Sequence, residues 1–490
     1  MILFKPKLYC LFVLLACGCA PVKSANTSDV VQTSDSSLAQ VAIGSNPGRA
    51  IPATFMGIDM EYDRSTGILG SSVVGVNTAY RNLVGNLTAY GSGPIIVRIG
   101  GNSSDSRKGI TNVLPFAEFA KAVGSHFILG VNLGAGNVDT AVDQTKSFIS
   151  QMPPNTLDAI EIGNEPEGFI GAGFRKPPYT SQNYLKDYDE WRAKIFPLLP
   201  AGTRLTGPAW AHYPSPADAK AFLAAEHSYL YGLSQHSYAS GSAGNSCTSG
   251  IPFDILLRPE TATYGPTQVK SEVVLAHGYN LPVRLDELGA VSSCAGQDGV
   301  SNTFGSALWA IDTMFEYASV GVDGINWYNS NGDLDSAFEF AVGNITDAMK
   351  PVSALYLKKV NPLYYGMLFF QVAVGKQAHL LPVSMSTQEN VKTWATVDAA
   401  GVVRLVVINK SADSGIVSIN LPGFRTSTVL RLTASSVSSK NGVTIAGQTM
   451  DGSSDGRLQG VKRLETLNPS SGGFRLSTGA YSAVIVEFSR

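Results

Sequence analysis

The chain has 490 residues, of which 44% are hydrophobic and 15% are charged, and its formal net charge is −2. This composition is typical of a globular protein with one large domain and a smaller one. A charge so close to zero provides no extended basic surface, so it argues against nucleic acid or anionic polymers as non-specific partners.

Residues 1–20 have the pattern of an export signal. Two lysines precede the apolar run Leu8 to Ala16, which is too short to span a bilayer comfortably. The motif "LLAC" resembles a bacterial lipobox, in which Cys17 would be lipidated; Cys19 is a second candidate, and an ordinary signal cleaved near Ala20 is the alternative. We therefore expect an exported protein. In a bacterium it would be periplasmic or a surface lipoprotein, with the membrane touched only through that anchor, and otherwise it would be secreted.

Residues 21–44 are predicted to be a flexible tether. The stretch 22–42 is rich in Ser, Thr, Asp and Ala and shows little apolar periodicity. Beyond it only two cysteines remain, Cys247 and Cys294. Two cysteines in an oxidising compartment suggest one disulfide, although the sequence leaves the distance between them open.

Eight short apolar segments follow, separated by longer stretches with helical spacing such as 114–125 and 303–321. The eight segments are 53–62, 94–105, 126–136, 157–167, 203–212, 229–240, 281–291 and 321–330. Uniformly apolar strands that alternate with helices predict a closed (β/α)₈ TIM barrel over residues 45–373, with 354–375 as its last helix. An open doubly wound sheet is the competing fold, but no glycine-rich dinucleotide loop follows the first strand.

The pattern changes near residue 374. Apolar and polar residues now alternate in short runs, and Gly, Ser, Asn and Pro lie between the runs. Residues 374–490 are therefore predicted to form a C-terminal antiparallel β-sandwich domain. Its strands do not decide whether this domain binds carbohydrate or only supports the barrel.

Two glutamates stand at the ends of predicted barrel strands. Glu165 follows the fourth strand in "IGNEP", and Glu287 ends the seventh. Strand C-termini share one face of such a barrel, so the two carboxyl groups are expected to meet in one pocket. Hydrolysis of a glycosidic bond needs such a pair, one carboxyl protonated and the other ionised.

The motifs "VRIGGNSSD", "EIGNEPEGF", "QHSY" and "GVSNTFGSALWAID" together resemble glycoside hydrolase family 79, the β-glucuronidase and heparanase group. That family consists of retaining (β/α)₈ glycosidases with an appended β-domain. The resemblance implies Glu165 as the acid/base and Glu287 as the nucleophile. It also implies sugar contacts from Asp59, Asn102, Asn164, Tyr238 and Tyr328.

Several polar residues near the strand ends have a structural alternative. Arg98 is equally compatible with a structural ion pair and with support of Glu287. Asn102 could cap the following helix. Tyr238 is expected to donate a hydrogen bond to Glu287, and Asn164 to bind the sugar 2-hydroxyl.

Other residues at these ends are expected to be structural. His236 and Asn132 are read as structural residues, and side-chain alternation is expected to send only one of Asp286 and Glu287 into the barrel mouth. Trp327 could stack on a sugar face, as could Trp210 less readily, or each could fill the core. Glu61 and Glu167 are expected at the rim.

The expected activity is exo-cleavage of a terminal β-glucuronic acid, with or without a 4-O-methyl group, because no long basic insertion resembles that of heparanase. Tyr328 and the loop 292–299 are the candidate donors to the uronate carboxylate, but this loop lacks the tyrosine found in similar enzymes. A retaining glycosidase for a neutral sugar (xylose, galactose or glucose) and a non-catalytic carbohydrate-binding surface lipoprotein remain alternatives. The six histidines show no metal-ligand spacing, so neither metal nor cofactor is predicted.

Overall fold

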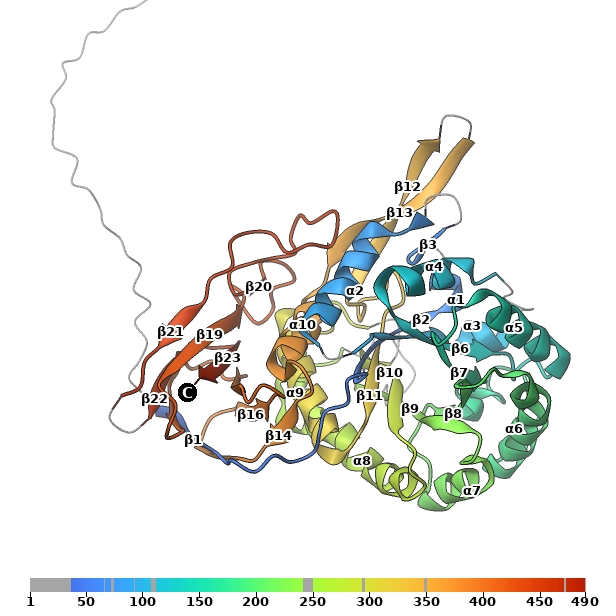
Figure 1. The fold of residues 1–490 in the computed structure, drawn as a ribbon, viewed down its shortest axis with the longest axis horizontal. Coiled ribbons are helices and arrows are strands. Elements are labelled where there is room, and N and C mark those ends of the chain that lie inside the picture. The colour runs from blue at the N-terminus through green and yellow to red at the C-terminus, as the bar shows by residue number, and fades with distance from the viewer. Residues whose placement is uncertain are drawn as a thin grey trace, which may run out of the picture. The chain divides into compact units, whose positions relative to one another are not determined.

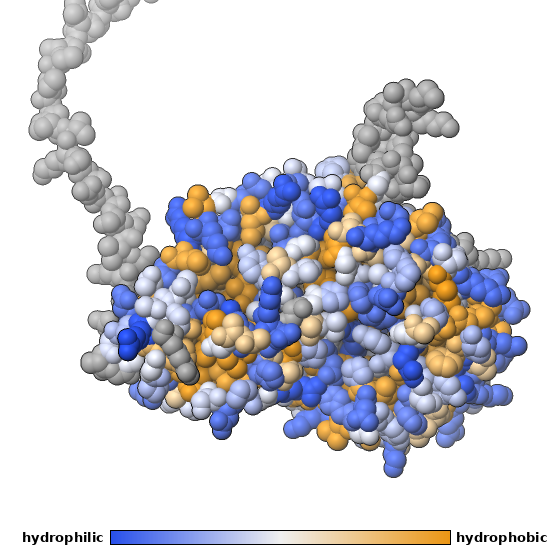
Figure 2. Space-filling view, in the orientation of Figure 1, coloured by the Kyte–Doolittle hydropathy of each residue, from blue (hydrophilic) through white to orange (hydrophobic). Residues whose placement is uncertain are grey.

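The computed structural model describes residues 37–489 except 66, 72–74, 92, 107–111, 241–249, 293–295, 348–349 and 471–472. The predictions on Cys17, Cys19, Cys247 and Cys294 lie outside these residues, as does part of the loop 292–299. Figure 2 shows hydrophobic residues in small groups between hydrophilic ones on the face in view. Among the described residues, no helix combines the length and the apolar character needed to span a bilayer.

Eight parallel strands close into a barrel, which confirms the predicted fold. Each strand lies within one of the eight predicted segments. The strands are β2 (Met56–Glu61), β5 (Ile96–Gly100), β6 (His126–Val131), β7 (Leu157–Ile162), β8 (Arg204–Trp210), β9 (Leu230–Ser240), β10 (Val283–Val291) and β11 (Gly324–Tyr328). Neighbours pair in the order of the chain, and β11 pairs with β2 to close the ring. All strand C-termini therefore meet at one mouth.

Helices surround this barrel (Figure 1). The long ones are α2 (Thr78–Tyr90), α4 (Leu114–Val123), α5 (Val138–Gln151), α6 (Ser181–Ile195), α7 (Pro216–Glu226), α8 (Pro259–Gly278), α9 (Phe304–Val320) and α10 (Pro362–Val374). Short helical turns at the mouth are α1 (Tyr62–Ser65), α3 (Asn102–Ser106) and the 3₁₀ turn η1 (Pro166–Gly168), and η2 (Phe196–Leu198) and η3 (Phe253–Leu257) lie between longer elements. The ribbon β3 (Gly70–Ser71) with β4 (Gly75–Val76) follows α1.

The last predicted helix, 354–375, is only half right. Its first part belongs to β13 (Lys350–Val360), which pairs with β12 (Phe338–Asp347) in a hairpin that projects from the barrel in Figure 1. The helix α10 begins only at Pro362. A residue before proline favours extended backbone, and Asn361 is extended with φ −82° and ψ 159°, so the helix starts there.

The C-terminal domain consists of two antiparallel-rich sheets around their own core. One is β15–β1–β18–β22, and the other is β14–β16–β17–β23–β19–β20, with β21 beside β19. Their bounds are β1 (Ser37–Ile43), β14 (His379–Leu381), β15 (Val383–Thr387), β16 (Val391–Val397), β17 (Val403–Asn409), β18 (Gly415–Asn420), β19 (Thr426–Thr433), β20 (Thr444–Ile445), β21 (Glu465–Leu467), β22 (Phe474–Thr478) and β23 (Ser482–Ser489).

The strand β1 corrects the predicted tether over 21–44. Residues 37–43 pair with β15 on one side and β18 on the other. Leu38, Ala39 and Val41 are buried in the core of the β-domain. Three buried apolar residues within seven suffice for a strand when existing strands pair with it on both sides, so the domain includes a segment more than 300 positions before its other strands.

Candidate active site

A cavity of about 890 Å³ opens at the mouth of the barrel. Cavities that bind small ligands have volumes of about 300–1,000 Å³. Among the residues predicted for the site, five line this cavity: Asn102, Glu165, Tyr238, Glu287 and Tyr328. They come from the ends of five different barrel strands or the loops after them.

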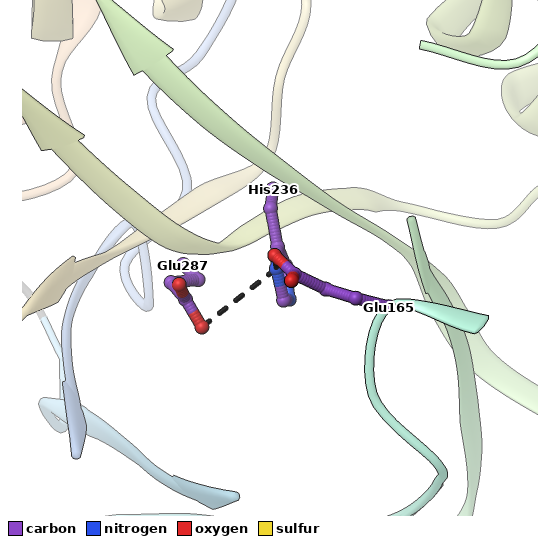
Figure 3. A group of neighbouring side chains, drawn as sticks. All are labelled: Glu165, His236 and Glu287. Atoms are coloured by element: carbon purple, nitrogen blue, oxygen red, sulfur yellow. Dashed lines mark hydrogen bonds and ion pairs between the residues drawn. The ribbon is translucent and has the colours of Figure 1, made fainter. Parts of the chain in front are cut away.

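The carboxyl groups of Glu165 and Glu287 meet at one histidine. His236 Nδ1 lies 2.9 Å from Glu165 Oε1 and 3.7 Å from Glu287 Oε2. One oxygen of each carboxyl and one ring nitrogen of His236 lie within 4.8 Å of one another. Figure 3 shows the two glutamate side chains approaching the histidine from separate parts of the chain. The structure thus brings together two acidic residues that are far apart in the sequence.

The backbone at Glu165 is held in an unfavourable conformation. Its φ is 47°, in the left-handed region that residues other than glycine rarely adopt. The N–H of Glu165 donates to the carbonyl of Ala209 over 3.0 Å, and Ala209 itself has φ 53°. Such a conformation costs on the order of 1–3 kcal/mol and is concentrated at functional sites.

Glu287 is held by two donors from the barrel. The hydroxyl of Tyr238 donates to Oε1 over 2.6 Å, as expected, and Arg98 Nη1 donates to Oε2 over 2.9 Å. Tyr238 belongs to β9 and Arg98 to β5, so the donors reach the carboxylate from two strands of the ring. Charge-assisted hydrogen bonds of this kind hold a carboxylate in a fixed orientation.

Arg98 is the centre of a buried network and fills both roles left open for it. It is fully buried and binds Asp59 Oδ1 over 3.0 Å and Glu161 Oε2 over 2.7 Å. Its Nη2 also donates to Asn164 Oδ1 over 2.7 Å. Asp59 is 1% exposed and is not among the cavity residues, so the structure gives it a place beneath Glu287 and not the expected contact with the sugar.

A bulge in β10 overrides the alternation expected for Asp286 and Glu287. Leu285 pairs with Gln235 and Glu287 with His236, so Asp286 is an extra residue in the strand. Asp286 is buried inside the barrel, and its Oδ1 lies 3.6 Å from His236 Nε2. Burial raises the pKa of Asp286, and the charge of Glu161 raises it further, so this carboxyl favours the neutral form.

The pKa shifts of His236 and Glu165 favour a proton on the histidine over one on the glutamate. Burial alone would lower the pKa of His236, but the charge of Glu287 and the hydrogen bond to Glu165 raise it to about 10. Burial opposes the ionisation of Glu165 as well, but its hydrogen bond with His236 and the charge of His236 prevail and lower the pKa of Glu165. In the free protein an ionised Glu165 therefore faces a protonated His236.

The two predicted asparagines lie next to each other. Asn164 Nδ2 donates to Asn102 Oδ1 over 3.2 Å, and the backbone N–H of Asn164 donates to Asp105 Oδ2 over 2.8 Å. Asn102 does not cap α3, because Glu61 does: its two oxygens accept from the N–H groups of Asn102 and Ser103 over 3.0 and 2.9 Å. The amide of Asn102 therefore faces the cavity and Asn164.

Trp327 does not reach the cavity, so the predicted stacking on a sugar is wrong. Its side chain is fully buried and packs edge-on against Trp309 of α9, with ring centroids 5.4 Å apart. On the same strand Asn326 points inward and binds the carbonyls of Ile58 and Ile96. Alternation turns the residue between Asn326 and Tyr328 outward, toward the helices.

The remaining candidates are placed as follows. Tyr328 lines the cavity and donates to Asp333 Oδ2 over 3.2 Å. Trp210 packs in the core against Phe222, and Asn132 donates to the carbonyls of Ser104 and Asp105, a structural role as expected.

The sequence interpretation did not foresee the position of His236 between the two glutamates. The reading as a structural histidine overlooked the spacing in "QHSY". His236 and Tyr238 are two positions apart in β9, so a strand that directs Tyr238 toward Glu287 directs His236 to the same face.

The three central residues could in principle hold a metal ion, since their ligand atoms are close enough. The hydrogen bonds argue for another use. Both oxygens of Glu287 already accept bonds, one of them from the cationic Arg98. A protonated imidazole is no ligand, and His236 carries its proton over the neutral range. The donor set fits acid–base chemistry better than a metal centre.

The folded chain is similar to several solved glycosidases. It resembles a 4-O-α-L-rhamnosyl-β-D-glucuronidase from Fusarium oxysporum with 19% identity, a TM-score of 0.74, and coverage of 91% of this chain and 99% of that one. It resembles a GH51 arabinofuranosidase from Xanthomonas axonopodis pv. citri with 14% identity, a TM-score of 0.68, and coverage of 92% and 100%. At these identities the likeness concerns the fold.

The sequence itself matches one family model. No curated protein sequence matches the chain. Residues 393–485, however, match the model described as the glycosyl hydrolase family 79 C-terminal beta domain. This match lies entirely within the β-domain, which follows the (β/α)₈ barrel in the chain. The family-model match supports the resemblance of the barrel motifs to glycoside hydrolase family 79.

Proposed function

We propose that the protein is a retaining, exo-acting β-glucuronidase that releases terminal glucuronic acid, with or without a 4-O-methyl group, from a glycan or glycoside. The observation that carries this proposal is the approach of the Glu165 and Glu287 carboxyl oxygens to within 4.8 Å. Carboxyl groups about 5–5.5 Å apart are typical of retaining glycosidases, whereas inverting enzymes keep them about 6.5–9.5 Å apart.

Glu287 is the proposed nucleophile. Arg98 and Tyr238 fix its two oxygens, and the carboxylate attacks the anomeric carbon as the bond to the leaving oxygen breaks. The product of this step is a covalent glycosyl-enzyme ester. Asn164, whose Nδ2 donates to Asn102 Oδ1 at the cavity wall, is the proposed partner of the sugar 2-hydroxyl together with Asn102.

Glu165 is the proposed acid/base, and His236 is its proton store. In the first step Glu165 protonates the leaving oxygen with the proton held by His236, 2.9 Å away. Formation of the ester removes the charge of Glu287, which is the main interaction that raises the pKa of His236, so the proton is released when it is needed. In the second step Glu165 takes a proton from the attacking water, and Glu287 is released from the ester with its negative charge restored. That charge raises the pKa of His236 again, so the proton passes from Glu165 to the histidine.

Glucuronic acid as the released sugar is supported by the family-model match and by the fold neighbour, which is named a 4-O-α-L-rhamnosyl-β-D-glucuronidase. Tyr328 and Ser292 line the cavity and are the proposed donors to the uronate carboxylate.

A neutral sugar is the second candidate, and one observation favours it. Six carboxyl groups line the cavity, and none of the described residues that line it is a lysine or an arginine. The six are Glu61, Glu165, Glu167, Glu287, Asp333 and Asp335. An anionic sugar would enter against this charge unless hydroxyl and amide donors compensate.

A panel of aryl β-glycosides tests the proposal. We expect the glucuronide to be hydrolysed faster than the xyloside, galactoside or glucoside, and NMR of the first product to show the β anomer. A faster neutral substrate would shift the assignment to the second candidate. An α anomer as first product would refute the retaining mechanism, and saturable binding without turnover would refute catalysis.

A further inference from the structure

The cavity has a second wall that takes no part in holding the two glutamates. This wall comes from the segments after β7 and β8 and from the first turns of α8. Its polar and aromatic side chains are Glu167, His212, Tyr213, Tyr264 and Gln268.

The wall lies on the Glu165 side of the site. Glu167 follows Glu165 by two positions in η1, and its carboxylate accepts hydrogen bonds from the backbone N–H groups of Ala211 and His212 over 3.4 and 3.3 Å. These bonds join the two loops into one surface. The acid/base protonates the oxygen of the departing group, so the departing group of a substrate lies on this side.

Tyr264 is the prominent residue of this wall. Its side chain is 57% exposed although it lines the cavity, and Gln268 lies one turn later on the same face of α8. An exposed tyrosine at a cavity presents a flat apolar ring with a polar end. That is the surface on which the C–H face of a pyranose ring packs.

The helix α8 packs closely against neighbouring hydroxyl groups at the residue next to Tyr264. The hydroxyl of Tyr213 lies 2.7 Å from Ser237 Oγ, which lies 2.6 Å from the hydroxyl of Tyr317. α8 packs so closely on these hydroxyls that a Cβ at Gly265 would collide with Tyr317.

Gly265 is followed by Pro266, and both lie inside the helix. Gly and Pro are the two residues least favourable in helix interiors. A helix that contains both directly after Tyr264 departs from local preference, as sequences do where function sets the geometry.

We propose that Tyr264, Gln268 and Glu167 form a binding site for an uncharged pyranose in the leaving-group position, so that the substrate is a glycan and not a glycoside of a small aglycone. The proposal rests on the glycosidase function proposed above. The ring of Tyr264 packs on the sugar, while the Gln268 amide and the Glu167 carboxylate bind its hydroxyls. A sulfated or uronic acid sugar is disfavoured here because Glu167 is acidic and no described residue of the wall is a lysine or an arginine.

Two substrates with the same glycon but different leaving groups distinguish binding at this wall from the chemistry at Glu165 and Glu287. One is the β-glycosyl fluoride, whose single-atom leaving group cannot reach the wall. The other is the best-cleaved member of a set of disaccharides that join the glycon to each hydroxyl of methyl β-D-galactopyranoside. We expect Tyr264→Ala to lower kcat/KM on the disaccharide about threefold to tenfold more than on the fluoride.

Tyr356→Ala is the matched control. Tyr356 is 55% exposed, nearly as much as Tyr264, but it lies on β13 and outside the cavity. The Tyr356→Ala substitution should leave the ratio of kcat/KM on the disaccharide to kcat/KM on the fluoride unchanged. An equal loss on both substrates, or no loss on the disaccharide, in a Tyr264→Ala protein with wild-type melting temperature would overturn the proposal. A wild-type protein that does not hydrolyse the fluoride would instead refute the glycosidase function itself.

Discussion

The surroundings of Glu287 and Glu165 differ in almost every respect. Glu287 lies within a barrel strand, its side chain is 10% exposed, and a buried arginine and a tyrosine hold both its oxygens. Glu165 lies on a loop after its strand, its side chain is 27% exposed, and its carboxylate contacts one histidine nitrogen. The Glu287 side chain is fixed by its donors, whereas the Glu165 carboxyl group can exchange a proton with His236 or with water.

The difference matches what the two proposed chemical roles require. A nucleophile must be ionised and aimed, and donors from rigid strands achieve this. An acid/base must gain and lose a proton in every cycle, so it needs a partner that titrates and access to water. The barrel therefore distributes rigidity unequally between two residues of the same type.

Loss of Glu287 should have the largest effect. Glu287→Gly removes the group that is proposed to form the glycosyl-enzyme bond, so we expect kcat on an aryl β-glycoside to fall by at least about 10⁴-fold. The fold should persist, because Arg98 keeps Asp59 and Glu161 as partners. Steady-state kinetics and circular dichroism measure the two expectations.

Azide distinguishes the nucleophile from its neighbour. In Glu287→Gly an added azide can attack from the vacated side and should give the α-glycosyl azide. The same anion in Glu165→Gly attacks the covalent intermediate from the other side and should give the β-glycosyl azide. An exchange of these two products would reverse the assigned roles.

Loss of Glu165 should have a smaller effect that depends on the leaving group. Glu165→Gly removes general acid catalysis, which contributes about 10²–10⁴-fold. A disaccharide needs protonation of its leaving oxygen and should lose the full factor, whereas a dinitrophenyl glycoside needs little and should show a slow second step. Equal losses on both substrates would speak against the acid role.

The donors of Glu287 separate positioning from stability. Tyr238→Phe removes one hydrogen bond to a carboxylate and should lower kcat about 10–100-fold with little change in melting temperature. Arg98→Met leaves Asp59 and Glu161 without their buried partner and should cost about 3–5 kcal/mol of unfolding free energy. A Tyr238→Phe protein as unstable as Arg98→Met would show that both residues are mainly structural.

The same contrast explains what could be predicted from the sequence. Eight apolar segments predict the barrel because hydrophobic burial repeats in every strand, and the barrel alone brings Glu165 and Glu287 to one mouth. Position 327 could also have been predicted correctly: if Tyr328 faces the cavity, its neighbour must face the helices. The strand over 37–43 could not, since its partners lie more than 300 residues away.

Local exceptions to regular structure were beyond the sequence pattern. The bulge that turns both Asp286 and Glu287 inward depends on the register with β9, which alternation along one strand does not reveal. The left-handed backbone of Glu165 depends on a bond to Ala209 in the next strand. Both exceptions lie at the site, where regular geometry would misplace a carboxyl group.

The smallest effect concerns pH and tests whether His236 couples the two glutamates. The folded pKa of His236, about 10, is above its ordinary 6.5, so its protonated form stabilises the fold below 6.5 and this stabilisation is lost as pH rises toward 10. In His236→Asn the unfolding free energy should fall less over that window than in the wild type. Glu165 would then hold the proton alone, and the basic limb of kcat/KM should move to lower pH. Identical pH profiles of stability and of kcat/KM in the two proteins would mean that His236 does not couple the ionisation of Glu287 to the protonation of Glu165.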